Sequence, residues 1–348
     1  MSSPDNVRSR LLSLVDRFAG RKIAVAGDFV LDRFVHGLPK RISREAPVLI
    51  LAWSREENVP GGGANTVANI AALSGNPAAA GAVGPDAEGR EIASLFERAG
   101  VDRSGLVEVP GYATPTKTRI LGGGVHSIRQ QVVRIDREDV LPDDPALSAK
   151  LRDNVRRAAA ESSVLVLSDY GYGSSRPEWI GAAREANPSI RVLVDSRFRL
   201  TEYAGADAAT PNEEELERAA GEPLDDSEER FERAGRALLG RLSSPALLVT
   251  RGSRGMALFR PQSPTLSIPV SGTSQVADVT GAGDTVMATF ALALAAGATE
   301  PEAALLSNFA GGIVVMKMGT ATVTPAELRE AIELDRAVLP AVAAGGGI

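Results

Sequence analysis

The chain contains no cysteine, and it has only two histidines among its 348 residues. Disulfide bonds, thiolate nucleophiles and cysteine-based zinc sites are therefore excluded. The sequence also has no Ser-His-Asp set, no cluster of metal-binding histidines and no GxxxxGK[ST] phosphate-binding motif. Aromatic residues make up only 4% of the chain, whereas hydrophobic residues make up 44%. Because Ala, Gly and Val dominate, we expect closely packed elements around a large core.

Excess positive charge and long apolar runs are also missing. The formal net charge is −6, which argues against a nucleic-acid partner or an anionic membrane held by bulk charge. The longest apolar run, residues 285–297, is shorter than the ~20 residues of a membrane span. The N-terminal segment lacks the apolar region of a signal peptide. We therefore expect a soluble cytoplasmic protein without membrane contact.

The order of apolar and amphipathic segments indicates the fold class. Helical patterns at 89–100 and 151–161 alternate with short runs rich in Val, Ile and Leu, which are typical of buried strands. This alternation predicts a three-layer α/β fold around a parallel sheet, whose ligands bind at the carboxyl ends of the strands. The predicted strands are 22–28, 163–169, 191–196 and 246–250. The polar residues at their ends are Asp28, Asp169, Asp195 and Thr250.

Two segments interrupt this alternation. Residues 33–55 read as extended and partly alternating, and residues 113–135 read as a hairpin that turns near Gly122–Gly124. Together they predict a small β-sheet outside the main one. Both histidines, His36 and His126, fall in these segments, where we expect surface or packing roles for them.

The stretch "DVTGAGD" combines three small residues with a carboxylate. Gly281, Ala282 and Gly283 would let a ligand approach the backbone N–H groups, and a helix is expected to begin at or near Gly283. Helix N-termini bind anions. Asp284 would then lie beside the anion, an unfavourable place unless the carboxylate accepts a proton from an attacking hydroxyl. The alternative is an ordinary glycine turn with an acidic first helical turn.

Two further motifs each allow a structural and a functional interpretation. Asn212 and Glu215 in "TPNEEELE" have the spacing of a capping box, and they also suit Mg²⁺ held through water near a phosphate. In "VPGGGANTVANIAALSG" the glycines 61–63 and Asn65 would present polar groups to a ligand. The alternative there is a tight turn before a packed helix, and the GxGxxG dinucleotide pattern fails at Thr66.

Carboxylates and glycines near other strand ends are equally ambiguous. Asp28, Asp32 and Asp169 suit sugar hydroxyls, each of which donates a hydrogen bond, or they are loop residues. Gly252 and Gly255 in "VTRGSRGM" would form a turn at the edge of a nucleotide, or simply a hairpin.

Taken together, these motifs resemble those of a known family. "DVTGAGDTV" resembles the C-terminal signature of the ribokinase-like (PfkB) sugar kinases, "GGGANTVANIAALSG" their N-terminal glycine motif, and "TPNEEELE" their Asn-x-x-Glu motif. The resemblance spans roughly residues 20–330. Within the family, "GDFVLDRFVHGLPKRISREAPV", "SDYGYG", "LLVTRGSRGMALF" and "KMGTATVTPAEL" resemble the kinases that phosphorylate D-glycero-D-manno-heptose 7-phosphate at O1. Many of those are fused to an adenylyltransferase, and this sequence resembles the stand-alone form.

The resemblance implies a ribokinase-like α/β/α sandwich with a small β-sheet lid and a role for most residues above. Asp284 is the expected base, and the N–H groups of residues 281–283 form the expected anion hole. Asn212 and Glu215 would support Mg²⁺ beside ATP, and Asp278 and Thr280 lie where relatives coordinate a monovalent cation such as K⁺. The expected sugar-binding residues are Asp28, Asp32, Gly62, Gly63, Asn65 and Asp169. The expected nucleotide-site residues are Arg197, Thr250, Gly252, Gly255 and Asn308.

The resemblance also implies one kinase domain over residues 1–335, with lid segments at about 33–55 and 113–135, and a tail at 336–348. Lids of this family often pair across a homodimer. The sequence departs from the heptose kinases at two lysine positions, which Tyr172 and Arg197 occupy. Lys117 and Arg119, with Arg44 and Arg129, would compensate toward a sugar phosphate. Two alternatives remain open: a kinase of another sugar or sugar phosphate, and a non-catalytic nucleotide or sugar sensor.

Overall fold

The computed structural model describes residues 3–123, 130–272 and 277–344. Gly124 of the expected hairpin turn, His126 and Arg129 lie outside these ranges. In the described ranges, no helix combines the length and the apolar character that crossing a membrane requires.

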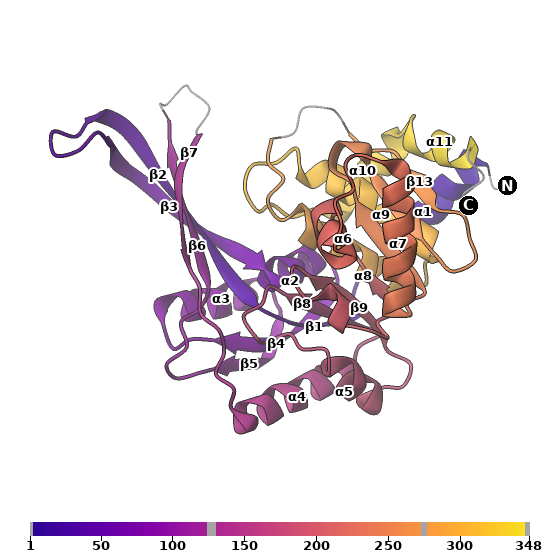
Figure 1. The fold of residues 1–348 in the computed structure, drawn as a ribbon, viewed down its shortest axis with the longest axis horizontal. Helices are drawn as coiled ribbons and strands as arrows, with labels where there is room; N and C mark the ends of the chain where they lie inside the picture. The colour runs from indigo at the N-terminus through magenta and orange to yellow at the C-terminus, as the bar shows by residue number, and fades with distance from the viewer. Residues whose placement is uncertain (1–2, 124–129, 273–276, 345–348) are drawn as a thin grey trace.

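The large sheet runs through the centre of the molecule (Figure 1), and in the described residues its strands lie in the order β13-β12-β11-β10-β9-β8-β1-β4-β5. From β5 to β11 all neighbours are parallel, as the alternation predicts. The edge differs, because β12 pairs antiparallel with β11 and β13 with β12. The connection between β11 and β12 is a single short turn, Gly252–Arg254, which is too short for a parallel crossover. The strands are β1 Lys22–Gly27, β4 Asn76–Val83, β5 Asp102–Glu108, β8 Val164–Asp169, β9 Arg191–Ser196, β10 Ala208–Ala209, β11 Ala246–Thr250, β12 Met256–Phe259 and β13 Leu266–Ile268.

Helices cover both faces of this sheet, because alternate strand residues point to opposite sides. Ile23 and Val25 of β1 belong to one buried cluster, whereas Ala24 and Ala26 belong to the other. The first cluster lies under α1 Pro4–Asp16, α2 Gly63–Ala72, α3 Ala87–Arg98, α8 Ala282–Ala295, α9 Glu300–Val314, α10 Pro325–Leu334 and α11 Val338–Ala344. The second lies under α4 Pro145–Ala160, α5 Trp179–Ala186, α6 Glu213–Ala220 and α7 Glu228–Leu242. The predicted three layers are therefore confirmed.

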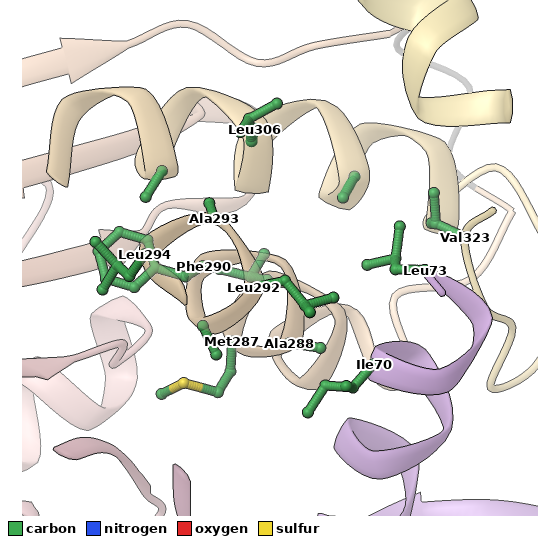
Figure 2. Packing of buried hydrophobic residues seen from close by; sticks show 14 of the residues in the cluster. Ile70, Leu73, Met287, Ala288, Phe290, Leu292, Ala293, Leu294, Leu306 and Val323 are labelled. Carbon is green, nitrogen blue, oxygen red and sulfur yellow. The ribbon is translucent and has the colours of Figure 1, made fainter. Parts of the chain in front are cut away.

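Helix α8 is apolar nearly all round, so it is buried on every side. Figure 2 shows α8 between α9, which carries Leu306, and α2, with Ala288 of α8 beside Ile70 of α2. This packing fixes the position of the first turn of α8 relative to α2.

A second sheet projects away from the helices (Figure 1), with the strand order β3-β2-β6-β7. Its strands are β2 Phe29–Ile42, β3 Leu49–Gly62, β6 Thr116–Gly122 and β7 Gln130–Arg137. The predicted small β-sheet is thus present. Strand β2 follows β1 after one residue, Asp28, so the small sheet begins at the carboxyl edge of the large one.

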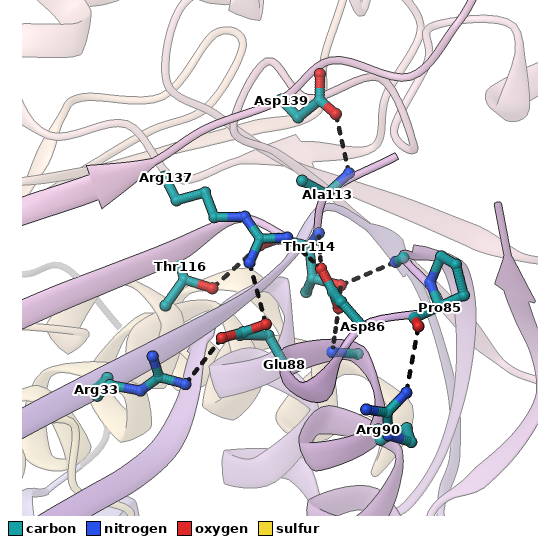
Figure 3. A network of polar contacts seen from close by, with 12 residues as sticks. Arg33, Pro85, Asp86, Glu88, Arg90, Ala113, Thr114, Thr116, Arg137 and Asp139 are labelled. Carbon is teal, nitrogen blue, oxygen red and sulfur yellow. Dashed lines mark hydrogen bonds and ion pairs between the residues drawn. The ribbon is translucent and has the colours of Figure 1, made fainter. Parts of the chain in front are cut away.

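An ion-pair network ties the base of the small sheet to the start of α3 (Figure 3). Glu88 lies 3.0 Å from Arg33 of β2 and 3.1 Å from Arg137 of β7. Arg137 also meets Asp86, whose carboxylate caps α3 by accepting from the N–H of Gly89. Two strands of the small sheet are therefore held to the same helix end.

Candidate active site

Asp284 lies at the centre of the candidate site, in the first turn of α8, with only 4% of its surface exposed. Its Oδ2 accepts a hydrogen bond from Nδ2 of Asn65 at 2.9 Å. Its Oδ1 accepts from the hydroxyls of Tyr170 at 2.9 Å and Thr66 at 3.3 Å. The carboxylate thus joins α8, α2 and the segment after β8.

The local sequence explains why these elements approach so closely. Gly281 caps α8 with φ of +75°, and a Cβ there would lie 2.4 Å from Nδ2 of Asn65. Only glycine fits both the left-handed backbone and this contact. Gly63 begins α2, and its N–H donates to the carbonyl of Asp28, so the glycine motif brings α2 directly against the end of β1.

Burial raises the pKa of Asp284 to about 7, and the negative charge of Asp32 adds to this rise. The hydrogen bonds from Asn65, Tyr170 and Thr66 act in the opposite direction, because they stabilise the ionised form. A carboxylate with a pKa near neutrality is well matched to accepting a proton under cellular conditions.

The first turn of α8 leaves room for a ligand. A Cβ built on Gly283 would meet nothing within 4 Å. The helix has no side-chain N-cap. The N–H of Ala282 donates to the carbonyl of Val279 at 3.2 Å, whereas Gly283 faces the open space. The sequence-predicted anion cradle is geometrically possible here, directly beside the buried carboxylate.

Asp28 has a structural task that differs from its expected place in the sugar site. It is 1% exposed, and its carboxylate accepts from the backbone N–H groups of Tyr170, Tyr172 and Ser174 at 2.7–2.9 Å. Burial raises its pKa to about 6 against these hydrogen bonds. Asp28 therefore holds the backbone of the "SDYGYGS" segment in place.

The other two expected sugar carboxylates are each paired with an arginine. Asp32 lies 2.6 Å from Nη1 of Arg119, whose guanidinium also stacks on Phe34. Asp169 accepts from Arg199 and from Ser196, both at 2.8 Å. Arg119 was singled out from the sequence, whereas Arg199 and Tyr170 were missed. No spacing rule connects Arg199 to Asp169, because the pairing depends on β8 and β9 lying side by side.

The environment of Lys117 weakens its expected role toward a substrate phosphate. Its ammonium lies 3.3 Å from both Asp136 and Glu138 and 3.4 Å from the hydroxyl of Tyr172. Tyr172 donates to Glu138 at 2.5 Å. The residue at the expected lysine position thus belongs to a polar cluster in which Lys117 is already neutralised by two carboxylates.

Asn212 and Glu215 form the capping box of α6. Oδ1 of Asn212 accepts from the N–H of Glu215 at 2.8 Å, and Oε2 of Glu215 accepts from the N–H of Asn212 at 2.9 Å. Burial and the charge of Glu215 raise the pKa of Asp195 well above its ordinary value. These two carboxylates disfavour each other's ionisation, an arrangement that a cation would relieve. In the described ranges, no three His, Cys, Asp or Glu side chains are grouped to hold a metal by themselves.

The expected nucleotide-site residues fall into four places. Thr250 forms a backbone bridge with Asn212, which puts the end of β11 beside the capping box. Gly255 and Asn308 both meet the segment after β13, where Nδ2 of Asn308 donates to the carbonyl of Pro269. Gly252 has φ of +55° in the turn of the β11–β12 hairpin, so the hairpin alternative is what the structure shows. Arg197 lines a cavity of about 260 Å³ together with Glu215, Arg218 and Arg241.

The remaining expected residues pack against the site without joining it. Asp278 accepts from the N–H groups of Thr280 at 2.9 Å and Gly319 at 3.1 Å. Burial raises its pKa, but these hydrogen bonds outweigh burial and hold the pKa below its ordinary value. Gly62 has φ of +54° and adjoins the ring of Tyr170.

Comparison with known proteins adds to this geometry. Residues 21–327 match the pfkB family of carbohydrate kinases. The chain is 41% identical over 345 residues to the bifunctional protein HldE of Paramagnetospirillum magneticum, covering 97% of this chain and 69% of that protein. It is 42% identical over 324 residues to HldE of Methylococcus capsulatus, covering 92% of this chain and 66% of that one. The chain thus spans about two thirds of the length of these relatives.

Solved structures show the same fold. Arabidopsis thaliana ribokinase, complexed with ribose and ATP, superposes with a TM-score of 0.69 at 22% identity, covering 91% of this chain and 100% of that one. Phosphofructokinase-2 from Escherichia coli, in complex with potassium, gives a TM-score of 0.72 at 19% identity, covering 90% and 98%. At such low identity these likenesses establish the fold alone.

Proposed function

Since the chain belongs to the pfkB family of carbohydrate kinases and is therefore an ATP-dependent sugar kinase, we propose that it phosphorylates O1 of D-glycero-D-manno-heptose 7-phosphate. The observation that carries the chemistry is the buried Asp284 at the open N-terminus of α8. The choice of sugar rests on the motifs in β2, the segment after β8 and the region around residues 317–328. Such a kinase would act in the cytoplasm, where it would supply heptose phosphates for lipopolysaccharide precursors.

The residues would divide the reaction among them. Asp284 accepts the proton of the sugar hydroxyl as its oxygen attacks the γ-phosphorus of ATP. The bond from that phosphorus to the β,γ-bridging oxygen breaks, and ADP leaves. The N–H groups of Ala282 and Gly283 would stabilise the charge on the transferring phosphoryl oxygens. Asp32 and Asn65 would hold the sugar hydroxyls, with Asp169 beside them.

Mg²⁺ would be held at Glu215, with Asn212 and Asp195 beside it, and would neutralise phosphate charge when bound with ATP. Burial raises the pKa of both carboxyls, and the charge of Glu215 raises the pKa of Asp195 further, which supports this assignment because a bound cation would stabilise the ionised forms. A K⁺ role for Asp278 and Thr280 is part of the same proposal, and it predicts that replacing K⁺ by a bulky organic cation lowers turnover.

The small sheet would act as the lid and as the surface of a homodimer. Its strands expose large apolar side chains, including Trp53 at 69%, Ile42 at 59% and Ile135 at 58%. A sheet that projects from the body with such residues uncovered is typical of an interface. Closing it over the sugar would exclude water from the phosphoryl group.

A second acceptor is favoured by one observation. Lys117 is neutralised by two carboxylates, and Tyr172 stands at the expected lysine position. This polar cluster would suit a hydroxyl better than a phosphate, which favours an unphosphorylated sugar. Only the acceptor differs between the two candidates, because the geometry around Asp284 serves both.

A coupled assay of ADP release over a panel of sugars and sugar phosphates would test the assignment. Heptose 7-phosphate should give the highest kcat/KM, and NMR of the product should show phosphate at O1. Turnover of neutral sugars without turnover of heptose 7-phosphate would favour the second candidate. Equal sugar-dependent ADP release by the wild type and the Asp284→Asn variant would contradict the assignment of Asp284 as base. A protein that binds ATP but releases no ADP in response to any sugar would be a sensor.

A further inference from the structure

A ring of buried hydrogen bonds links the candidate base to a residue that lies outside the site. The hydroxyl of Thr285 lies 3.1 Å from Oδ1 of Asn69, the nearer of its two acceptors, the other being the carbonyl of Gly281 at 3.3 Å. Nδ2 of Asn69 donates to Oδ1 of Asn65 at 3.1 Å and to its backbone carbonyl at 3.0 Å. Nδ2 of Asn65 then donates to Asp284 at 2.9 Å, and the carbonyl of Gly281 lies 3.3 Å from the same nitrogen. Because Thr285 follows Asp284 in α8, the ring closes between α2 and α8.

The direction of these bonds matters because an asparagine amide can present either an oxygen or an NH₂ group. An Asn65 oxygen facing the carboxylate of Asp284 would repel it, whereas the NH₂ group stabilises it. Asn69 donates to the Asn65 oxygen, so the NH₂ group is left to face Asp284. Thr285 in turn keeps the oxygen of Asn69 directed toward α8, which leaves the Asn69 NH₂ group free to donate.

Burial makes this orientation strict. Asn69 and Thr285 are 0% exposed and Asn65 is 1% exposed. The α2–α8 contact around them also contains buried apolar residues of both helices, such as Ile70 and Ala288 (Figure 2). An unpaired amide in such surroundings costs more than the net value of the bond it makes, so the packed interface keeps the ring in one arrangement.

We propose that Asn69 is a positioning residue of the kinase: it does not reach the substrate but holds the Asn65 amide so that its NH₂ group faces the carboxylate of Asp284. The inference rests on the proposed role of Asp284 as base and deepens it. Asn65 adjoins the reacting groups, whereas Asn69 lies one helical turn further into the core, so the two have separable roles.

The titratable groups that face Asp284 come from three other elements. They are Tyr170 after β8, Asp32 of β2 and Asp195 of β9. None of them contacts Asn69 through a hydrogen bond in the described residues. A change in the ionisation of Asp284 caused by altering Asn69 would therefore be transmitted through Asn65.

Asn69→Leu removes the donor at nearly constant volume, and Thr289→Val is the matched control. Thr289 is equally buried in α8, but its hydroxyl donates only to the carbonyl of Thr285 at 2.8 Å. The first readout is the pKa of the Asp284 carboxyl in the free enzyme, from carbon-13 NMR assigned with Asp284→Asn. It should rise in Asn69→Leu and stay unchanged in Thr289→Val. No shift in Asn69→Leu would overturn the proposal, and this readout does not depend on knowing the sugar.

The second readout is turnover with the sugar that the wild-type enzyme uses. Loss of a hydrogen bond to a charged group predicts a kcat about 10-fold lower in Asn69→Leu, with the acidic limb of its pH profile moved upward and KM for ATP unchanged. In an Asn65→Ala background, Asn69→Leu should lower kcat by less than about twofold. Full additivity of the two losses would show that Asn69 does not act through Asn65.

If Asn69→Leu does not fold, Thr285→Val and Thr285→Ser replace it. Thr285→Val should raise the pKa of Asp284 in the same direction, and Thr285→Ser, which restores a hydroxyl, should return it to the wild-type value. Equal pKa values for Asp284 in both variants and the wild type would refute the ring. Failure of the proposed function would look different: the NMR shifts would persist while Asp284→Asn retained turnover.

Discussion

The buried position of Asp284 implies that ionising its carboxyl lowers the stability of the folded protein. Its pKa of about 7, against an ordinary 3.8, means that the folded state holds the proton more tightly than the unfolded chain. Stability from this group is fully present below pH 3.8 and is lost as the pH rises through 7. The shift of about 3 units corresponds to about 4 kcal/mol at pH 8. Burial is the largest cause, so the cost arises from ionising a carboxyl inside the protein.

Asp284→Asn removes this titration, so its stability relative to the wild type should depend on pH. The wild-type cost is roughly 1–2 kcal/mol at pH 5 and about 4 kcal/mol at pH 8. The free energy of unfolding of the variant minus that of the wild type should therefore rise by roughly 3 kcal/mol between these pH values. If the introduced amide turns its NH₂ group toward the NH₂ group of Asn65, the repulsion lowers the stability of the variant by the same amount at every pH. The difference in the free energy of unfolding is then smaller throughout, but its dependence on pH is unchanged.

Urea denaturation of both proteins at pH 5, 6, 7 and 8 would measure this slope, and kcat of the wild type over the same range gives an independent check. At pH 6 only about a tenth of the base is ionised, so turnover should be roughly tenfold below its plateau. Asp284→Asn should lower the plateau kcat by ~10²–10⁴ while leaving ATP binding nearly intact. A stability difference that stays constant from pH 5 to pH 8 would refute the reasoning, whatever the kinetics show.

Three other outcomes follow from the described contacts. Gly281→Ala should abolish turnover and lower the free energy of unfolding by ~1–3 kcal/mol, because the added Cβ would contact Asn65 and the φ of this residue is positive. A wild-type kcat in this variant would contradict the close approach of Gly281 to Asn65. Glu215→Gln keeps a capping acceptor, so thermal stability should hold while the Mg²⁺ concentration for half-maximal activity rises; an unchanged Mg²⁺ titration would remove Glu215 from the metal site. Trp53→Glu should shift the protein to a smaller species in light scattering, with Ser54→Glu as the neighbouring control, and an unchanged mass would exclude this face from the dimer.

The parts of the fold that a short stretch of sequence determines could be predicted. The strands 191–196 and 246–250 coincide with β9 and β11 because each is a buried apolar run with a clear boundary. Strand β4, "NPAAAGAV", was missed because its small residues resemble neither a β-branched strand nor a loop. Whether the edge of the sheet is antiparallel depends on whether the chain turns back at Gly252 or continues into a crossover. The residues around Gly252 are compatible with either path.

The residues of the candidate site divide in the same way, into those that a local pattern identifies and those that it does not. Asp284 and its glycine turn could be identified because their chemistry lies within one short segment. The hydroxyl of Tyr170 could not, since it reaches Asp284 from 114 residues away. Asp28 shows the opposite difficulty: a carboxylate at a strand end suggests a ligand, but in the fold it also accepts from three backbone N–H groups. Backbone donors in a bent segment need an acceptor, and a buried carboxylate can supply it as a ligand site or as a structural group.

This competition also explains why the acceptor is harder to infer than the reaction. The proposed phosphoryl transfer uses Asp284 and N–H groups at one helix end. The residues proposed for sugar recognition lie in β2, β6 and the segment after β8, and each of these also pairs with another protein group. Arg119 neutralises Asp32, and Glu138 with Asp136 neutralises Lys117. The substrate must therefore compete with ion pairs that the protein already makes, so the strength of those pairs decides which sugar binds.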